Sequence, residues 1–185
     1  MTGPAQLRVL KYVMVTPGKV VVDGSPVSNA TSLGDLYREL NCSYPKFHKM
    51  DGLCKTGFLA AELALNGMPA ELREHMAIIL FNRSGSLVTD RNYQRTIADT
   101  ANYFPSPALF VYTLANIVTG EIAIRHKIMG ETAFYILDHH DDAQIKAIVA
   151  DSLAATRPTA VLAGWVEYAD ENHYLADFKL IIPER

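Results

Sequence analysis

The apolar run from Met76 to Phe81 constrains the fold more than any other feature of the sequence. It contains no polar position, so neither face of the segment is suited to water. A strand of this kind occurs inside an α/β sheet that has helices packed on both faces. The polar stretch Asn82–Ser86 follows at once and ends the run. The sequence therefore predicts a central buried strand and, around it, a layered α/β domain.

The rest of the chain alternates between segments with the patterns of strands and of helices. The predicted elements, in chain order, are two short strands within 7–22 around a turn at 16–19, a loop over 25–32, a buried helix over 50–65, a polar helix over 90–100, two helices joined near Gly120, a strand over 132–137, a helix that begins at Asp141 or Asp142 and is ended by Pro158, and two strands over 159–168 and 174–182. The polar tip between the last two strands is typical of a hairpin, so the C-terminal strand is expected to be antiparallel. These patterns predict a single domain over residues 1–185, with three layers and helices on both faces of a mixed sheet.

The charge balance and the hydropathy of the chain argue against nucleic-acid binding and against a membrane span. The chain has 17 Lys and Arg against 20 Asp and Glu, a formal net charge of -3, and no run of five basic residues. Binding to nucleic-acid phosphates requires a basic surface, so we expect no nucleic-acid partner. No apolar run approaches the roughly 20 residues that span a bilayer, and the first residues lack the pattern of a signal peptide. We therefore expect a cytoplasmic protein without a membrane span.

The cysteine content argues against a disulfide framework. Cys42 and Cys54 are the two cysteines of the chain, and no Cys-x-x-Cys pair is present. This spacing also disfavours a zinc site built on thiolates. Both side chains are expected to be reduced thiols.

The segment from residue 104 to residue 130 carries the most specific pattern in the sequence. A Ser-Pro pair is placed to open a helix, an Asn lies inside the helix, one Gly breaks it and a second Gly precedes a strand; these residues are Ser106, Pro107, Asn116, Gly120 and Gly130. Three other stretches stand in order around it: Lys49–Asp51 before the Ala-rich helix, Asn82–Ser86 after the buried strand, and Ala163-Gly164 with Glu167 on a later strand. Together they resemble the N-terminal half of the β-ketoacyl-acyl-carrier-protein synthases, the ketosynthases of the thiolase superfamily.

The resemblance implies a thiolase-like half domain and places the family's nucleophilic Cys at His139. This chain has Leu137-Asp138-His139-His140 at that point. An imidazole forms a far more labile acyl adduct than a thiolate does, so a thioester intermediate is not expected there. The second half of a ketosynthase, which supplies two catalytic His and a Lys, has no counterpart in this sequence. Cys54 is expected in a buried helix and does not replace the missing nucleophile.

The cluster Asp138–Asp142 allows three interpretations. Three carboxylates and two imidazoles lie within five residues, which suggests a metal or proton-transfer site. Adjacent His side chains, however, diverge on a strand and on a helix, so His139 and His140 are poorly placed to share one ion. We expect a helix-capping turn with solvated charges and no bound metal. The remaining interpretation is an acyl pocket in which His139 fills the place of the Cys.

The function that the resemblance implies is that of a non-catalytic ketosynthase-like subunit or accessory protein in fatty-acid or polyketide-type biosynthesis, without a cofactor. Two alternatives remain at this point. One is an acyltransferase or hydrolase with altered chemistry at Asp138–Asp142, and the other is a module that binds an acyl group or an acyl carrier protein. Phe110 and Asn116 are the candidate substrate-binding residues, and Phe110 is equally suited to core or interface packing.

The strand predicted at residues 131–137 carries an expectation about assembly. In the family that the chain resembles, this strand pairs edge to edge with its twofold mate. The segment is aromatic, β-branched and poor in charge, and an uncovered edge of that composition invites aggregation. We expect a homodimer, or a heterodimer with a full-length ketosynthase, whose interface includes Phe134 and Ile136. The alternative is a monomer in which residues 7–22 cover the edge.

Overall fold

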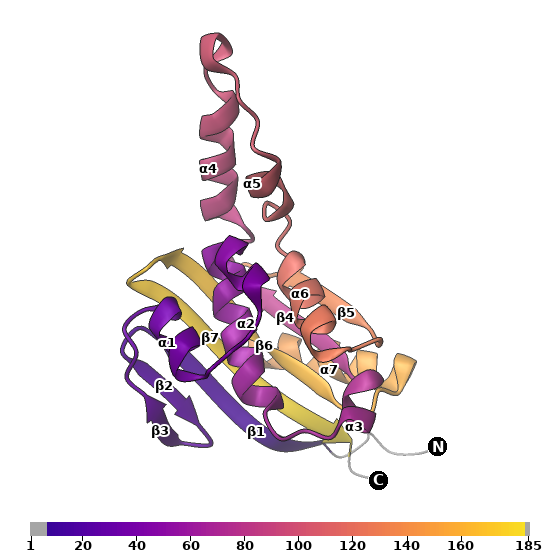
Figure 1. Ribbon diagram of the computed structural model, residues 1–185. Coiled ribbons are helices and arrows are strands. Elements are labelled where there is room, and N and C mark those ends of the chain that lie inside the picture. The colour runs from indigo at the N-terminus through magenta and orange to yellow at the C-terminus, as the bar shows by residue number, and fades with distance from the viewer. Residues whose placement is uncertain (1–6, 184–185) are drawn as a thin grey trace.

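A seven-stranded mixed sheet organises the chain in the computed structural model, which describes residues 7–183 (Figure 1). The strand order is β3-β2-β1-β7-β6-β4-β5. The strands are β1 (Leu7–Thr16), β2 (Lys19–Val22), β3 (Ser25–Ser28), β4 (Ala77–Asn82), β5 (Thr132–Ile136), β6 (Val161–Asp170) and β7 (His173–Pro183). The α-helices are α1 (Leu33–Glu39), α2 (Gly52–Leu65), α3 (Ala70–Glu74), α4 (Leu87–Ile97), α5 (Pro107–Val111), α6 (Ile117–His126) and α7 (Asp142–Thr156), and short 3-10 turns η1 and η2 lie at Pro45–Lys49 and Thr100–Asn102.

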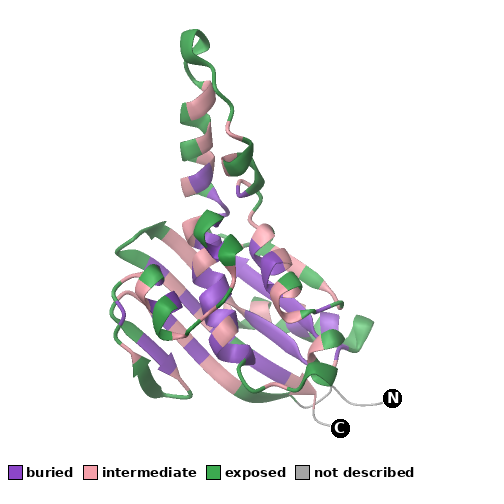
Figure 2. Ribbon diagram, viewed as in Figure 1, coloured by how far each residue is buried: buried purple, intermediate pink, exposed green. Residues whose placement is uncertain are grey.

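β4 confirms the prediction of a central buried strand. It pairs in parallel with β6 on one side and with β5 on the other. All its residues are buried, and they alternate between two cores (Figure 2). Ile78 and Leu80 face the larger core, whereas Ala77, Ile79 and Phe81 face the smaller one. The final hairpin is also confirmed, since β7 is antiparallel to both β6 and β1.

Helices cover the two faces of the sheet unequally. On one face α2 lies along the sheet, with α1 and α6 beside it, and eleven of its residues are buried (Figure 2). On the other face α7 packs Val149 and Leu153 against β4 and β6. The structure is therefore the expected three-layer α/β arrangement. No helix within residues 7–183 is long and apolar enough to cross a membrane.

Two sequence-based expectations about local structure were wrong. Residues 25–28 form the edge strand β3 instead of a loop, because β2 offers them a free edge after the turn at Asp23-Gly24. Gly120 lies inside α6 and does not join two helices. The helical segment is instead interrupted between α5 and α6. The C-cap of α5 is Tyr112, and a short turn leads from it to Asn116, the N-cap of α6.

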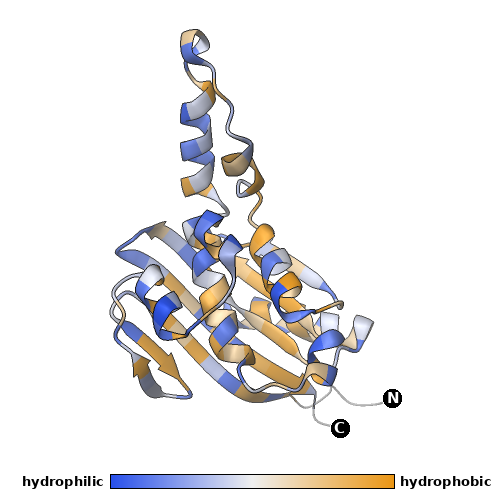
Figure 3. Cartoon of the chain, viewed as in Figure 1, coloured by the Kyte–Doolittle hydropathy of each residue, from blue (hydrophilic) through white to orange (hydrophobic). Residues whose placement is uncertain are grey.

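The segment 87–111, which we call the arm, projects away from the sheet (Figure 1). It consists of α4, η2 and α5. Thr89 is the one buried residue of α4, and α5 has none. Figure 3 shows that α4 is largely hydrophilic whereas α5 is hydrophobic, and Phe104 and Phe110 are 81% and 55% exposed. The arm thus carries apolar side chains that the body of the protein does not cover.

Glu62 joins two of the helices that cover the sheet. Its carboxylate on α2 accepts hydrogen bonds from Arg125 Nε (2.8 Å) and Nη2 (3.1 Å) on α6, and His126 Nε2 lies 3.0 Å from it. The His126 contact is close but is not aligned as a hydrogen bond. Burial raises the pKa of Glu62, but His126 and Arg125 outweigh it and lower the pKa to about 2.

We expect Glu62→Gln to reduce the free energy of unfolding by about 1–3 kcal/mol at pH 7, because it removes an ion pair that fixes α6 on α2. Since the folded-state pKa lies below the ordinary value of 4.5, this stabilisation is complete above pH 4.5 and disappears as the pH falls toward 2. Urea unfolding at pH 7 and at low pH measures both effects. A difference between variant and wild type that is the same at both pH values would contradict the assignment.

Candidate functional site

The turn between β5 and α7 holds the position that the sequence assigned to the missing nucleophile. Asp141 is the N-cap of α7, and its carboxylate accepts from the N–H groups of Ala143 (2.8 Å) and Gln144 (3.1 Å). These two backbone hydrogen bonds lower the pKa of Asp141. Asp141 is therefore the residue of the cluster that caps the helix. It is one of the two residues at which the sequence predicted the helix to begin.

His139 points into solvent at this turn. Its side chain is 67% exposed, and its Nδ1 lies 2.8 Å from the 86% exposed carboxylate of Asp138. A contact between two such exposed side chains has little stabilising value and no fixed geometry toward a substrate. The turn thus presents an imidazole on the surface and does not enclose it in an acyl pocket.

His140 turns toward the sheet. Its ring lies 5.0 Å from the ring of Trp165, a buried residue of β6. Together with Val149 of α7 and Ile181 of β7 they line a hollow of about 350 Å³ on the α7 face of the sheet. Phe110 lies on the arm, so the structure does not bring it to this hollow. In residues 7–183 no group of three or more His, Cys, Asp or Glu side chains is arranged to hold a metal ion.

Neither thiol of the chain is activated. Cys54 lies in the first turn of the buried helix α2, where the helix N-terminus would favour a thiolate. Burial, followed by the charges of Asp51 and Glu121, instead raises the pKa of Cys54 well above its ordinary value. Cys42 lies 3.6 Å from a Glu62 oxygen, and burial and that carboxylate raise its pKa to about 12. Both side chains therefore remain neutral thiols at physiological pH.

The loop Asn82–Ser86 is a structural turn, and several of its polar groups are hydrogen-bonded within the protein. The Asn82 side chain donates to the Gly85 carbonyl and accepts from the Gly85 N–H, both at 2.9 Å. Glu167 of β6 accepts hydrogen bonds from the Arg83 N–H and the Ser84 hydroxyl. Glu167, one of the residues that carried the resemblance, thus fixes this loop against the sheet.

The outer edge of β5 is uncovered in residues 7–183. β5 pairs with β4 alone, and residues 7–22 form β1 and β2 toward the opposite side of the sheet, so they do not cover this edge. Ile136 is 61% exposed. Phe134 is half-buried against the larger core, and Tyr135 stacks on Phe81 with ring centroids 5.5 Å apart.

A groove of about 800 Å³ runs between this edge and the base of the arm. Its walls are residues 83–86, 113–116 and 132–136. Asn116 lines the groove, whereas Phe110 packs farther out on the arm, 5.4 Å from the ring of Tyr93. The structure therefore places one of the two candidate substrate-binding residues at the β5 edge and the other away from it. Sequence patterns did not reveal the groove, because segments far apart in the chain form it.

The two edges of the sheet differ in how they are protected. The far edge, β3, has four residues and includes Pro26, which cannot donate a backbone hydrogen bond. β5 contains no Pro and no charged residue, and a register shift interrupts β3 but not β5. An edge of the β5 type is suited to pairing with another strand.

The fold is that of known ketosynthases and chain length factors. A ketosynthase in complex with its chain length factor from Xenorhabdus doucetiae superimposes with a TM-score of 0.69 at 14% identity, over 96% of this chain and 79% of that chain. The ishigamide ketosynthase/chain length factor gives a TM-score of 0.68 at 13% identity, over 95% of this chain and 62% of that chain. A type II polyketide synthase acyl-carrier protein in complex with its ketosynthase gives 0.65 at 11% identity, over 97% and 63%.

These comparisons establish the fold and show how much of each similar structure this chain covers. The chain spans less than two thirds of the length of the second and third structures. No family model matches the sequence, and no curated protein matches it either. At these identities the likeness shows the thiolase-like fold that the sequence predicted, and the function has to be argued from the site.

The state of the thiols can be tested by alkylation. At pH 7.5 we expect iodoacetamide to modify native Cys42 on the order of 10³-fold more slowly than a free cysteine, because the thiolate fraction falls with the raised pKa, and Cys54 to be at least as slow. Both should react at ordinary rates in urea. Rapid modification of either residue in the folded protein, located by peptide mass spectrometry, would contradict this result.

Proposed function

We propose that this protein is a non-catalytic ketosynthase-like subunit that acts in fatty-acid or polyketide-type biosynthesis by pairing with a full-length ketosynthase. The observation that carries the proposal is the uncovered β5 edge next to the arm, in a chain with the ketosynthase fold and no activated thiol. The protein thus combines the β5 edge, which is suited to pairing with another strand, with a β5–α7 turn that is poorly suited to acyl transfer. The protein then contributes structure to an assembly whose chemistry lies in the partner.

The β5–α7 turn supports the non-catalytic part of the proposal. Condensation requires that an acyl group be held as a thioester while the second substrate binds. At the position that the resemblance assigns to the thiol, the chain has the exposed pair Asp138 and His139. The acyltransferase or hydrolase alternative would need the same residues to be held in a fixed, partly desolvated geometry. Their exposure argues against that alternative.

The β5 edge supports the partner. Two of the similar structures contain, by their descriptions, a ketosynthase together with a chain length factor, and a third contains a ketosynthase with an acyl-carrier protein. We propose that β5 pairs with the corresponding strand of a ketosynthase and that the arm contributes its apolar side chains to the same contact. A homodimer uses the same edge and is the alternative assembly. An acyl carrier protein would then meet the assembled pair.

A pull-down with a ketosynthase encoded beside this protein tests the proposal, and Ile136→Lys is the informative variant. Ile136 is exposed, so the substitution should preserve the fold, whereas Phe134 contributes to the core. A charge buried without a partner in an interface costs several kcal/mol, so we expect the complex to weaken at least about 100-fold. Val27→Lys, on the exposed β3 edge, is the matched control and should bind normally.

Light scattering of the protein alone, with and without Ile136→Lys, separates the homodimer from the heterodimer. A wild-type monomer that associates with the ketosynthase supports the proposal. Equal binding by Ile136→Lys and wild type would contradict the use of the β5 edge. Intact-mass analysis after incubation with an acyl thioester should show no adduct, and a stable adduct would contradict the non-catalytic assignment.

A further inference from the structure

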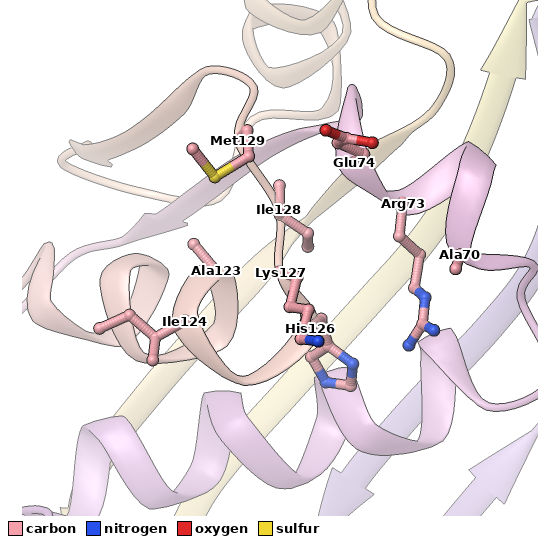
Figure 4. Close-up of a pocket in the computed structure, with 9 residues that line it drawn as sticks. All are labelled: Ala70, Arg73, Glu74, Ala123, Ile124, His126, Lys127, Ile128 and Met129. Atoms are coloured by element: carbon pink, nitrogen blue, oxygen red, sulfur yellow. The ribbon is translucent and has the colours of Figure 1, made fainter.

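A hollow of about 650 Å³ lies on another side of the protein, between α3 and the C-terminal end of α6 (Figure 4). Backbone contacts fix its walls. The Met129 N–H donates to the Glu74 carbonyl at 2.8 Å. At Gly130 the chain passes so close to the Met76 carbonyl that a Cβ would lie 2.1 Å from the oxygen. Backbone contacts therefore hold the two walls together, so the shape of the hollow does not depend on flexible side chains.

Three basic side chains enter this hollow from two elements. Arg73 comes from α3, and His126 and Lys127 come from the end of α6. Figure 4 shows Arg73 and His126 extending toward the same end of the hollow, while Glu74 and Met129 lie at the other. His126 is in contact with Glu62. Within residues 7–183, neither Arg73 nor Lys127 makes an ion pair.

The guanidinium of Arg73 contains a buried donor without a partner. Its Nε atom is shielded from solvent and makes no hydrogen bond within the described part of the chain. A buried charged donor without an acceptor is unfavourable, and proteins rarely leave one in that state. A planar guanidinium is matched by the paired oxygens of a carboxylate or a phosphate. The unused donor thus indicates an anionic group in the hollow.

The same hollow has an apolar wall that is open to solvent. Ile124 is 64% exposed and Met129 is 77% exposed, and Ile128 lies buried between them in the chain. Exposed apolar side chains beside unpaired cations suit a ligand that has an apolar part as well as a charge. Glu74 at the far end would repel a second anionic group, which favours a ligand with one charged head.

We infer that this hollow binds a small amphipathic anion, with a carboxylate or phosphate-ester head on Arg73 and Lys127 and an apolar chain along Ile124 and Met129. The helix dipole of α6 places partial negative charge at this end, and the basic residues of its last turn offset it. The site is separate from the β5 edge and from the turn at His139. Its existence does not depend on the proposed function.

Isothermal titration of the full 185-residue chain tests this inference. The ligands are octanoate, octyl phosphate, 1-octanol and inorganic phosphate. We expect the two amphipathic anions to bind at least tenfold more tightly than octanol, which lacks the charge, and than phosphate, which lacks the chain. Trp165 is the single tryptophan and lines the other hollow, so its fluorescence should not change on binding.

Variants locate the site. Arg73→Gln should weaken binding of octanoate at least tenfold, Lys127→Gln should weaken it to a smaller extent, and Ile124→Ser should weaken octyl phosphate but not inorganic phosphate. Lys49→Gln removes an exposed charge elsewhere and should have no effect. Circular dichroism confirms that each variant is folded, and Lys127→Gln and Ile124→Ser decide the question if Arg73→Gln does not fold. Absence of binding at millimolar ligand, unchanged binding by the folded variants, equal binding of octanol, or a change in Trp165 fluorescence would each overturn the inference.

Discussion

The burial of β4 on both faces is the constraint on which the rest of the structure depends. Because this strand has no polar side to show to water, the chain must supply helices above and below it, and α2 and α7 do so. β4 is also the strand that carries β5, so the same arrangement puts β5 at the margin of the sheet. The position of β4 therefore accounts for both the layered core and the open edge at β5.

The elements that the sequence predicted well are those whose hydrophobic pattern is local. The apolar run at β4, the alanine-rich α2 and the final hairpin follow from side-chain type alone. β3 was missed because its pairing with β2, not its composition, makes it a strand. The break expected near Gly120 is wrong, because a helix tolerates a single glycine and α6 continues through it.

The sequence predicted the turn at residues 138–142 in position and in character, as a helix-capping turn with solvated charges. The sequence located the turn at residues 138–142, and the structure shows its exposure and the capping role of Asp141. Cys54 also lies in a buried helix as expected, and burial raises its pKa more strongly than the N-terminus of α2 lowers it. The groove beside β5 could not be foreseen, because it brings together residues near 84, 115 and 134 that share no pattern.

Hydrogen exchange at β5 tests most directly the claim that this edge is where the protein meets its partner. The backbone amides of residues 132–136 that point away from β4 have no acceptor in the described chain, so they should exchange quickly in the free protein and slowly in a complex with the ketosynthase. The β3 amides serve as the internal reference and should not change. Protection at β5 upon complex formation is the predicted result, and a complex that leaves these amides as exposed as before would contradict the account.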